Sequence, residues 1–213
     1  MKPFFEPLIL FMVLFFRISA GRTAPGEFVE FSTSTEIIRI FMYNIPSLAL
    51  VWYLLLKVKS LKEWGISLPK KKDFITAVLS FFALFLIGLT ISLLSPYFDE
   101  IPGGPRVLPP QTWVSWAILA LSCFSSAYLE ESFFRFYLLS KREEMGLGPN
   151  RAVLVSTLLF SVCHFYEGPW GFLNAVLSGA FLAFIFLRFR SLHGIAIAHA
   201  LYNTLVYALG SIQ

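Results

Sequence analysis

The sequence contains little charge, and several long stretches contain none. Only 14% of its 213 residues are Asp, Glu, Lys or Arg, whereas 57% are hydrophobic and 17% aromatic. A soluble domain of this length carries more charge, because its surface has to be hydrated. The mean hydropathy is +0.71. These values exclude an ordinary soluble globular protein and predict a chain that crosses a membrane several times.

Signals for other classes are also missing. The two cysteines, Cys123 and Cys163, both lie in apolar stretches, so the sequence gives no disulfide framework and no CxxC metal pair. Long basic tracts and aromatic RNA-binding motifs are absent, so we assign the net charge of +4 to membrane-flanking loops and expect no nucleic-acid partner. Without an internal repeat or a low-complexity linker, residues 1–213 are expected to form one membrane domain.

Apolar segments define the expected architecture, since about 20 residues cross a bilayer as a helix. The sequence predicts an all-α, polytopic transmembrane helix bundle of about seven spans, within a range of six to eight. The segments are residues 4–20, 37–56, 74–94, 113–139, 152–165, 170–187 and 192–209.

The first segment has a competing interpretation. Lys2, the apolar run that follows and the small residues 19–21 resemble a secretory signal. Glu6 and Arg17 fit that pattern poorly, so a retained helix is favoured.

Basic residues recur in alternate loops, which predicts the orientation. By the positive-inside rule these loops face the cytoplasm. The chain is therefore expected to be a multi-pass cell-membrane protein with its amino end in the cytoplasm. The basic residues are Lys57, Lys59, Lys62, Lys70, Lys71, Lys72, Lys141, Arg142, Arg151, Arg188 and Arg190.

The segment 113–139 carries three charges, Glu130, Glu131 and Arg135. A charge at the bilayer centre costs roughly 2.5–3.5 kcal/mol, so such residues need a partner or a function. Glu131 and Arg135 are four residues apart on one helix face, which predicts an ion pair. Glu130 is about 140° around the helix from Arg135, so it is the carboxylate expected to remain free to act as a general base.

Two histidines are expected at a similar depth. At about 1.5 Å per residue from the basic ends, Glu130 lies roughly 15 Å, His164 roughly 20 Å and His199 roughly 12 Å into the membrane. His199 and Asn203 are four residues apart and could together hold a water, a metal or an oxyanion. Either histidine taken alone could instead form a purely structural hydrogen bond between helices. The pair of Glu131 and Arg135 could likewise serve only the packing of its helix. The presence of a glutamate and two histidines at a similar depth favours a catalytic cluster.

Three further features are expected to be structural. Ala175, Gly179 and Ala183 recur every four residues, which is typical of close helix packing. Cys163 diverges from its neighbour His164 by about 100° on a helix, so a thiol nucleophile is not expected there. His193 is expected at the membrane interface without a catalytic role.

These residues form three motifs in a fixed order. Glu130 to Arg135 reads EExxxR, Phe160 to His164 reads FxxxH, and His199 to Asn203 reads HxxxN. Together they resemble the CPBP family of intramembrane proteases, the CAAX protease and bacteriocin-processing family, which is related to the Ras-converting CAAX endopeptidase. The resemblance covers about residues 113–203, within a motif-bearing core expected at about 113–210.

The resemblance implies an endopeptidase with a site inside the bilayer that opens to the cytoplasm. It further implies that Glu130 acts with His164 to activate a water. His199 and Asn203 would bind the scissile carbonyl or its oxyanion, and Glu131 with Arg135 would support Glu130. The implied partners are the lipid bilayer and a peptide or membrane-anchored protein substrate, which could be prenylated.

The sequence does not decide whether the protein uses a metal. A glutamate with two histidines resembles a catalytic zinc site, but the sequence has no HExxH motif. The family is described both as metalloproteases and as metal-free glutamate proteases. If zinc or another divalent metal binds, His164, His199 and Glu130 are the expected ligands.

Two other classes of function compete with a protease. Intramembrane Glu, Arg and His also form the proton relays of ion-coupled carriers, although the inverted repeat and broken helices of such carriers are absent. A non-catalytic bacteriocin-immunity or scaffold protein could retain the same fold.

Overall fold

The computed structural model describes residues 4–16, 28–98 and 106–210 of the chain, which form a bundle of helices. In chain order the elements are α1 (Phe5–Leu14), β1 (Phe28–Val29), α2 (Thr33–Ile38), η2 (Arg39–Asn44), α3 (Ile45–Leu56), α4 (Lys71–Leu94), η3 (Ser95–Tyr97), β2 (Arg106–Val107), α5 (Trp113–Glu130), η4 (Glu131–Tyr137), α6 (Leu138–Ser140), α7 (Pro149–Val162), η5 (Phe165–Glu167), α8 (Gly168–Phe189) and α9 (Leu192–Gly210).

Two rods of the bundle each contain a π-helical segment. η2 joins α2 to α3, and η4 joins α5 to α6, with helical backbone angles on both sides of each junction. A π-helix has i→i+5 hydrogen bonds and is frequent at functional sites. Each π-segment therefore changes the direction of the side chains along its rod without ending the helix.

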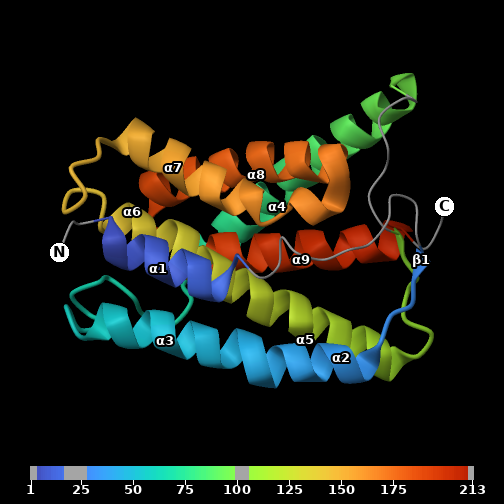
Figure 1. The fold of residues 1–213 in the computed structure, drawn as a ribbon, viewed down its shortest axis with the longest axis horizontal. Helices are drawn as coiled ribbons and strands as arrows, with labels where there is room; N and C mark the ends of the chain where they lie inside the picture. Colours follow the sequence, from blue (N-terminus) through green and yellow to red (C-terminus); the bar gives the residue numbers. More distant parts are fainter. Residues whose placement is uncertain (1–3, 17–27, 99–105, 211–213) are drawn as a thin grey trace.

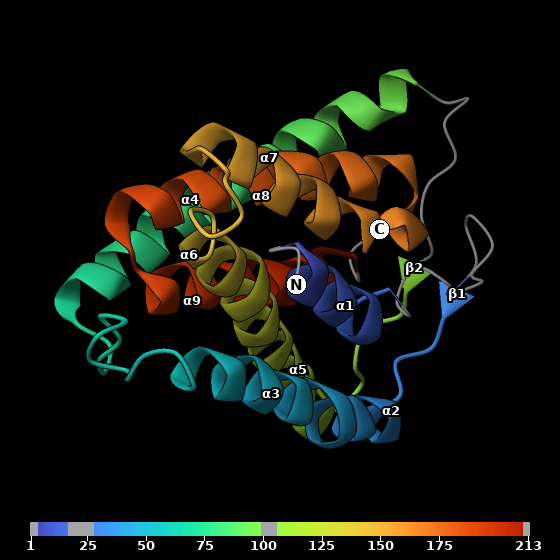
Figure 2. The ribbon, with the colours of Figure 1, turned by 60° about the vertical axis from the view of Figure 1, so that its left-hand side comes forward.

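The helices lie side by side around α9. Figures 1 and 2 show α9 passing through the bundle, with α4, α7 and α8 on one side and α1, α3 and α5 on the other. α9 packs against both α4 and α5, while α7 packs against α8. At one end of the bundle β1 and β2 form a short parallel pair. This arrangement brings α5, η4, α7, α8 and α9, which carry the three motifs and the small-residue seam, next to one another.

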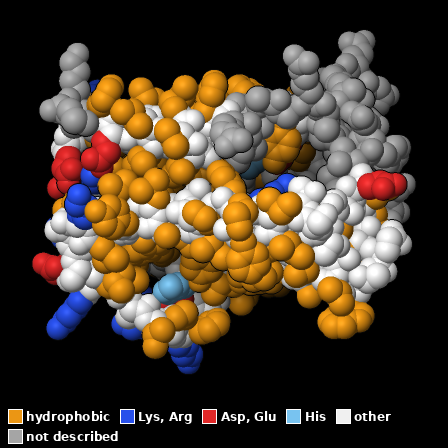
Figure 3. Space-filling view, turned by 60° about the horizontal axis from the view of Figure 1, so that its bottom comes forward, with side chains coloured by type: hydrophobic (Ala, Val, Ile, Leu, Met, Phe, Trp, Pro, Cys, Tyr) orange, Lys and Arg blue, Asp and Glu red, His pale blue; other side chains and the backbone are white. Residues whose placement is uncertain are grey.

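The all-α membrane bundle that the sequence predicts is confirmed. Four described helical stretches are long and apolar enough to cross a membrane: Thr33–Leu56, Lys71–Tyr97, Phe165–Phe189 and Leu192–Leu209. α1 is a shorter apolar helix, and the residues at 19–21 that suggested a signal lie outside the described residues. Figure 3 shows hydrophobic side chains over most of one face, with most charged groups toward one edge.

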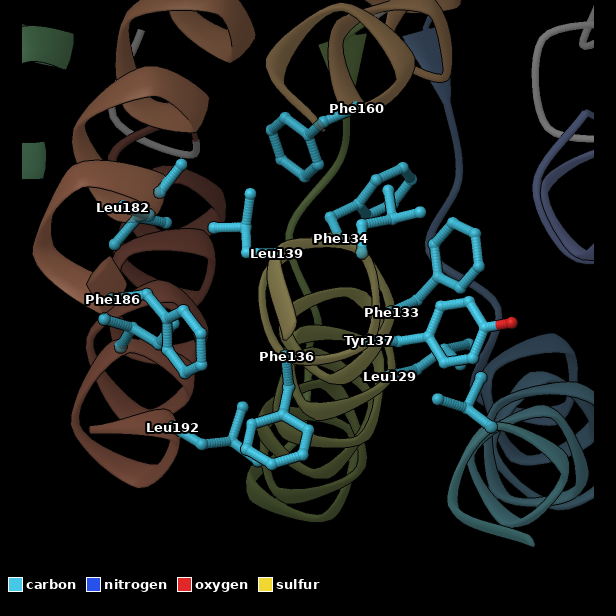
Figure 4. Close-up of a cluster of buried hydrophobic side chains, with 14 of the residues drawn as sticks. Leu129, Phe133, Phe134, Phe136, Tyr137, Leu139, Phe160, Leu182, Phe186 and Leu192 are labelled. Carbon is cyan, nitrogen blue, oxygen red and sulfur yellow. The ribbon is translucent and has the colours of Figure 1, made fainter. Parts of the chain in front are cut away.

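An aromatic core surrounds η4, all of whose residues are buried. Figure 4 shows Phe133, Phe134 and Tyr137 on one side of this helix and Phe160 nearby. The ring of Phe134 lies 5.0 Å from that of Phe133 and 5.4 Å from that of Phe160, in edge-on geometry. Edge-to-face contacts at these distances stabilise aromatic pairs beyond their burial. Phe15, which follows α1, adds a ring 4.7 Å from Phe134, so α1 covers η4.

Hydrogen bonds attach the α2–α3 rod to the α5–η4 rod, and each of them ends on a serine of the second rod. The serines recur at intervals of seven or three residues, which is the spacing of a helix-packing seam. The pairs are Thr33 with Ser115 (2.9 Å), Glu36 with Ser122, Asn44 with Ser125 (2.8 Å) and Trp52 with Ser132 (3.2 Å). The seam fixes the amino-terminal half of the chain in register against the motif-bearing half.

We predict that Ser125→Ala lowers the free energy of unfolding by about 1 kcal/mol. Asn44 is fully buried, and its Oδ1 has no hydrogen-bond partner in the described part of the chain. The substitution would leave its Nδ2 unpaired as well. Denaturant unfolding of the full chain in detergent measures the change. Ser92→Ala, at an exposed serine of α4, should change stability by less than about 0.5 kcal/mol, and equal effects of both would contradict the seam.

Candidate active site

Glu131, Arg135 and His199 form a buried polar group. The side chains of Glu131 and Arg135 have 0% exposure, and the Arg135 Nε lies 3.2 Å from the Glu131 Oε2. The other carboxylate oxygen, Oε1, lies 2.8 Å from Nδ1 of His199 on α9. The ion pair expected from the sequence therefore forms. Its carboxylate also binds the histidine of the third motif, which the sequence did not indicate.

Arg135 is held by two helices besides its own. Its Nη2 donates to the carbonyl oxygen of Gly179 on α8 at 3.3 Å, and its guanidinium lies 4.2 Å from the ring centre of Phe160 on α7. A Cβ at Gly179 would lie 2.9 Å from the Phe160 ring and 3.4 Å from Nη2 of Arg135. Ala175 and Ala183, one turn to either side, are buried. The seam of small residues thus allows the close approach that the arginine requires.

Glu130 is placed differently from its neighbour. Its side chain is 15% exposed, and its Oε1 accepts a hydrogen bond from Ser126 at 3.2 Å. Its Oε2 is buried without a hydrogen-bond partner among the described residues, and it lies 3.8 Å from Nε2 of His199. Glu130 is thus the carboxylate that Arg135 does not neutralise, as the helix angles predict, and one of its oxygens remains available.

His164 lies just beyond the end of α7. Its Nδ1 is 2.8 Å from the carbonyl oxygen of Phe160, so Nδ1 donates to that oxygen and Nε2 takes no part in this contact. The Phe160 ring lies 4.4 Å from the His164 ring and 5.9 Å from the His199 ring. The two histidines therefore flank one aromatic ring. No contact among the described side chains joins His164 directly to Glu130 or Glu131.

Asn203 lies one turn after His199 on α9 and is partly buried. Within the described part of the chain its side chain makes no hydrogen bond. It is free to bind a ligand, but no protein group orients it.

Besides the bond from Glu131 to His199, three contacts of the site were missed from the sequence. The hydroxyl of Ser126 could have been found, because it precedes Glu130 by four residues on an apolar helix. The carbonyl of Gly179 and the ring of Phe160 depend on how α7 and α8 pack against η4, which no local pattern specifies. In the sequence, Phe160 stands out only as the first residue of the FxxxH motif.

Cys163 and His193, which were expected to be structural, both contact neighbouring protein groups. The thiol of Cys163 is buried and lies 3.4 Å from the carbonyl oxygen of Leu159 on its own helix. His193 joins the hydroxyl of Tyr128 (3.1 Å) to the carbonyl oxygen of Ser67 (2.9 Å), which ties the loop before α4 to α5.

The expected metal ligands do not form a compact set. The part of the chain that the structure describes contains no group of three or more His, Cys, Asp or Glu side chains placed to hold one metal ion. His164 makes its contacts with Phe160, whereas His199 contacts the two glutamates. We therefore derive no chemical step through a metal.

The described site is a carboxylate–histidine cluster inside a helical membrane bundle. Residues 111–205 match the family model "Type II CAAX prenyl endopeptidase Rce1-like". This match confirms the resemblance noted on the three motifs. The family supports protease activity and implies a protein substrate in the membrane. No curated protein and no solved structure matched the chain.

We predict strong energetic coupling between Glu131 and Arg135. Glu131→Gln and Arg135→Met should each destabilise the protein by about 3–5 kcal/mol, because each leaves a buried charge without its partner. The double variant should be destabilised by at least about 1 kcal/mol less than the sum of the two single effects. Unfolding in detergent measures the cycle. The exposed pair of Arg142 and Glu143 serves as control, with coupling below about 0.5 kcal/mol. A buried pair with no more coupling than this control would contradict the assignment.

Proposed function

We propose that this chain is an intramembrane endopeptidase of the CAAX type, in which Glu130 activates a water to hydrolyse a peptide bond. The observation that carries the proposal is the free Oε2 of Glu130. This buried carboxylate oxygen lies 3.8 Å from the imidazole of His199, whose other nitrogen is fixed by Glu131. A buried carboxylate oxygen that accepts no hydrogen bond from the described protein groups can accept a proton from a water.

In the proposed first step the Oε2 of Glu130 takes a proton from a water, and the oxygen of that water bonds to the scissile carbonyl carbon. Nε2 of neutral His164 accepts a hydrogen bond from the same water and orients it. The carbonyl π electrons move to oxygen and form an oxyanion. A buried site strengthens each of these interactions relative to water.

His199 and Asn203 stabilise the oxyanion in this proposal. Protonated His199 donates Nδ1–H to Glu131 and Nε2–H toward the oxyanion, while the Asn203 amide donates from the next turn. When the tetrahedral intermediate collapses, the C–N bond breaks. Glu130 then returns its proton to the departing amine. Arg135 holds Glu131 in place through the ion pair and does not touch the substrate.

The expected substrate is a membrane-anchored protein or peptide with a CAAX-like tail, with or without a prenyl group. The metal alternative, in which His164, His199 and Glu130 would hold a divalent ion that acts as a Lewis acid, would require these side chains to move together from their described positions. A chelator separates the two versions.

We predict that Glu130→Gln lowers cleavage of membrane-tethered CAAX-type peptides by at least about 100-fold. The amide cannot accept the proton from water. Its carbonyl can still accept from Ser126, so the folded state should persist. Purified full-length protein in lipid vesicles, assayed with and without a chelator, measures the loss.

Glu143→Gln is the matched control, because Glu143 is an exposed glutamate in the loop before α7. It should cleave like the wild type. Unchanged cleavage by the Glu130 variant would remove Glu130 as the base, whereas no cleavage by the folded wild type would favour the scaffold function.

We further propose that the basic ends of the helices face the cytoplasm. The loops after α3, α6 and α8 lie at one end of the bundle (Figure 1, left). A cysteine at Ser60, in the loop after α3, should be protected from an impermeant thiol reagent in intact cells. A cysteine at Tyr97, in η3 at the opposite end, should react. The reverse labelling pattern would invert the orientation.

A further inference from the structure

A groove runs along the outward face of the first turns of α4. Its volume is about 570 Å³, and its walls are the exposed side chains of Lys71, Phe74, Ile75, Val78 and Leu79. The stretch that begins here, Lys71–Tyr97, has a mean hydropathy of 2.5, the highest of the four described candidate spans. Because this stretch is long and apolar enough to cross a membrane, the groove faces lipid acyl chains rather than water.

Three consecutive lysines lie at the mouth of the groove. Lys70 is the residue before α4, Lys71 and Lys72 begin the helix, and all three side chains are exposed. Residues three or four apart on a helix are neighbours, so Phe74 and Ile75 of the groove lie directly beside this lysine turn. Within the described ranges of the chain, the ion pairs involve none of the three lysines. Their charge is therefore available to a ligand.

The acidic residue of the same turn is directed into the bundle. Asp73 is 5% exposed, and its carboxylate accepts hydrogen bonds from the backbone N–H of Lys70 (2.8 Å) and from the hydroxyl of Ser191, which precedes α9. A Cβ at Gly194 would lie 2.8 Å from the carbonyl oxygen of Asp73, so α9 packs directly on this turn. The turn is thus fixed with its negative charge inward and its lysines outward.

The loop before α4 is also fixed, and it contacts the helices that carry the candidate site. Nε2 of His193 on α9 donates to the carbonyl oxygen of Ser67 at 2.9 Å. Nε1 of Trp64 donates to the carbonyl oxygen of Leu55 at 2.9 Å, and its ring centre lies 5.6 Å from that of Phe136 on η4. Figure 2 shows this loop at one edge of the bundle, between α3 and α4. A surface that is already ordered loses less conformational entropy on binding a ligand.

An exposed lysine cluster at the mouth of an apolar groove matches a phospholipid with an anionic headgroup. The phosphate oxygens accept hydrogen bonds from the ammonium groups, and an acyl chain fills the groove. Each lysine near an anionic lipid surface adds about fivefold to the affinity. In the orientation proposed above, these lysines meet the cytoplasmic leaflet, which carries anionic lipids. An acidic protein segment would also match the lysines, but it would leave a groove within an apolar span without an occupant.

We propose that this chain has a selective site for one anionic phospholipid, whose headgroup binds Lys70, Lys71 and Lys72 and whose acyl chain lies in the groove of α4. The site contains no residue of the three motifs. Its occupation requires no cleavage of a substrate, so the proposal can be tested independently of the proposed protease function.

The test is lipid binding to the purified full-length chain in detergent, counted by native mass spectrometry. The probes are phosphatidylglycerol and phosphatidylcholine with identical oleoyl chains, which differ in headgroup charge. The wild type should bind one phosphatidylglycerol about 10- to 100-fold more tightly than phosphatidylcholine. Lys71→Gln combined with Lys72→Gln should lower this preference by about 10-fold or more, because two of the three lysines are lost. Val78→Trp, which fills the groove, should weaken binding of phosphatidylglycerol by about fivefold.

Two controls match these variants. Arg151→Gln combined with Arg188→Gln removes the same charge from exposed arginines at the same end of the bundle, and it should keep the wild-type preference. Leu93→Trp, at an exposed leucine of α4 outside the groove, should bind phosphatidylglycerol like the wild type. Each preference compares two lipids on one preparation, so a smaller folded fraction does not imitate a loss of selectivity.

Three outcomes would overturn the site. The first is equal affinity of the wild type for the two lipids, and the second is an equal loss of preference in the lysine and arginine double variants, which would indicate general surface charge. The third is equal competition by glycerophosphoglycerol, the same headgroup without acyl chains, which would assign the lysines to a free phosphate ester instead of a lipid.

Discussion

Two charges that never meet solvent hold the motif-bearing half of this bundle together. Glu131 and Arg135 lie on one π-helical turn, both at 0% exposure. Neither could remain there alone, because a single buried charge loses its hydration without compensation. The carboxylate reaches α9 through His199, and the guanidinium reaches α8 through the Gly179 carbonyl and α7 through the Phe160 ring. Four helices thus converge on one ion pair, and the position of the candidate catalytic groups follows from it.

Steric features of the sequence make this convergence possible. The missing side chain at Gly179 lets α8 approach until its carbonyl meets Arg135, whereas a methyl group there would press on Phe160 and the guanidinium. Phe160 in turn separates the two histidines by packing against both rings. The spacing of the candidate acid–base groups is therefore a packing result, set by one small and one large residue.

Local spacing predicted the parts of this structure that depend on a single helix. The four-residue interval of Glu131 and Arg135, the divergence of Glu130 from Arg135 and the small-residue seam on α8 all follow from helix geometry, and all are found. The sequence did not predict the contacts between helices. These are the bond from Glu131 to His199, the bond from Arg135 to the Gly179 carbonyl, and the serine seam that bonds to Thr33, Glu36, Asn44 and Trp52. An ideal α-helical wheel also does not anticipate the π-turns of η2 and η4, which depend on tertiary packing.

The two ion pairs, Glu131 with Arg135 and Glu36 with Arg39, differ in how deeply their charges are buried. Both place an arginine beside a glutamate on one helix, three or four residues apart, yet one is sealed by aromatic rings and the other is half open. Burial suits a structural role, because water cannot weaken the pair. The half-exposed Arg39 guanidinium keeps donors that no described protein group uses. Burial therefore distinguishes the Glu131–Arg135 pair, which joins the motif-bearing helices, from the Glu36–Arg39 pair, whose arginine stays partly exposed.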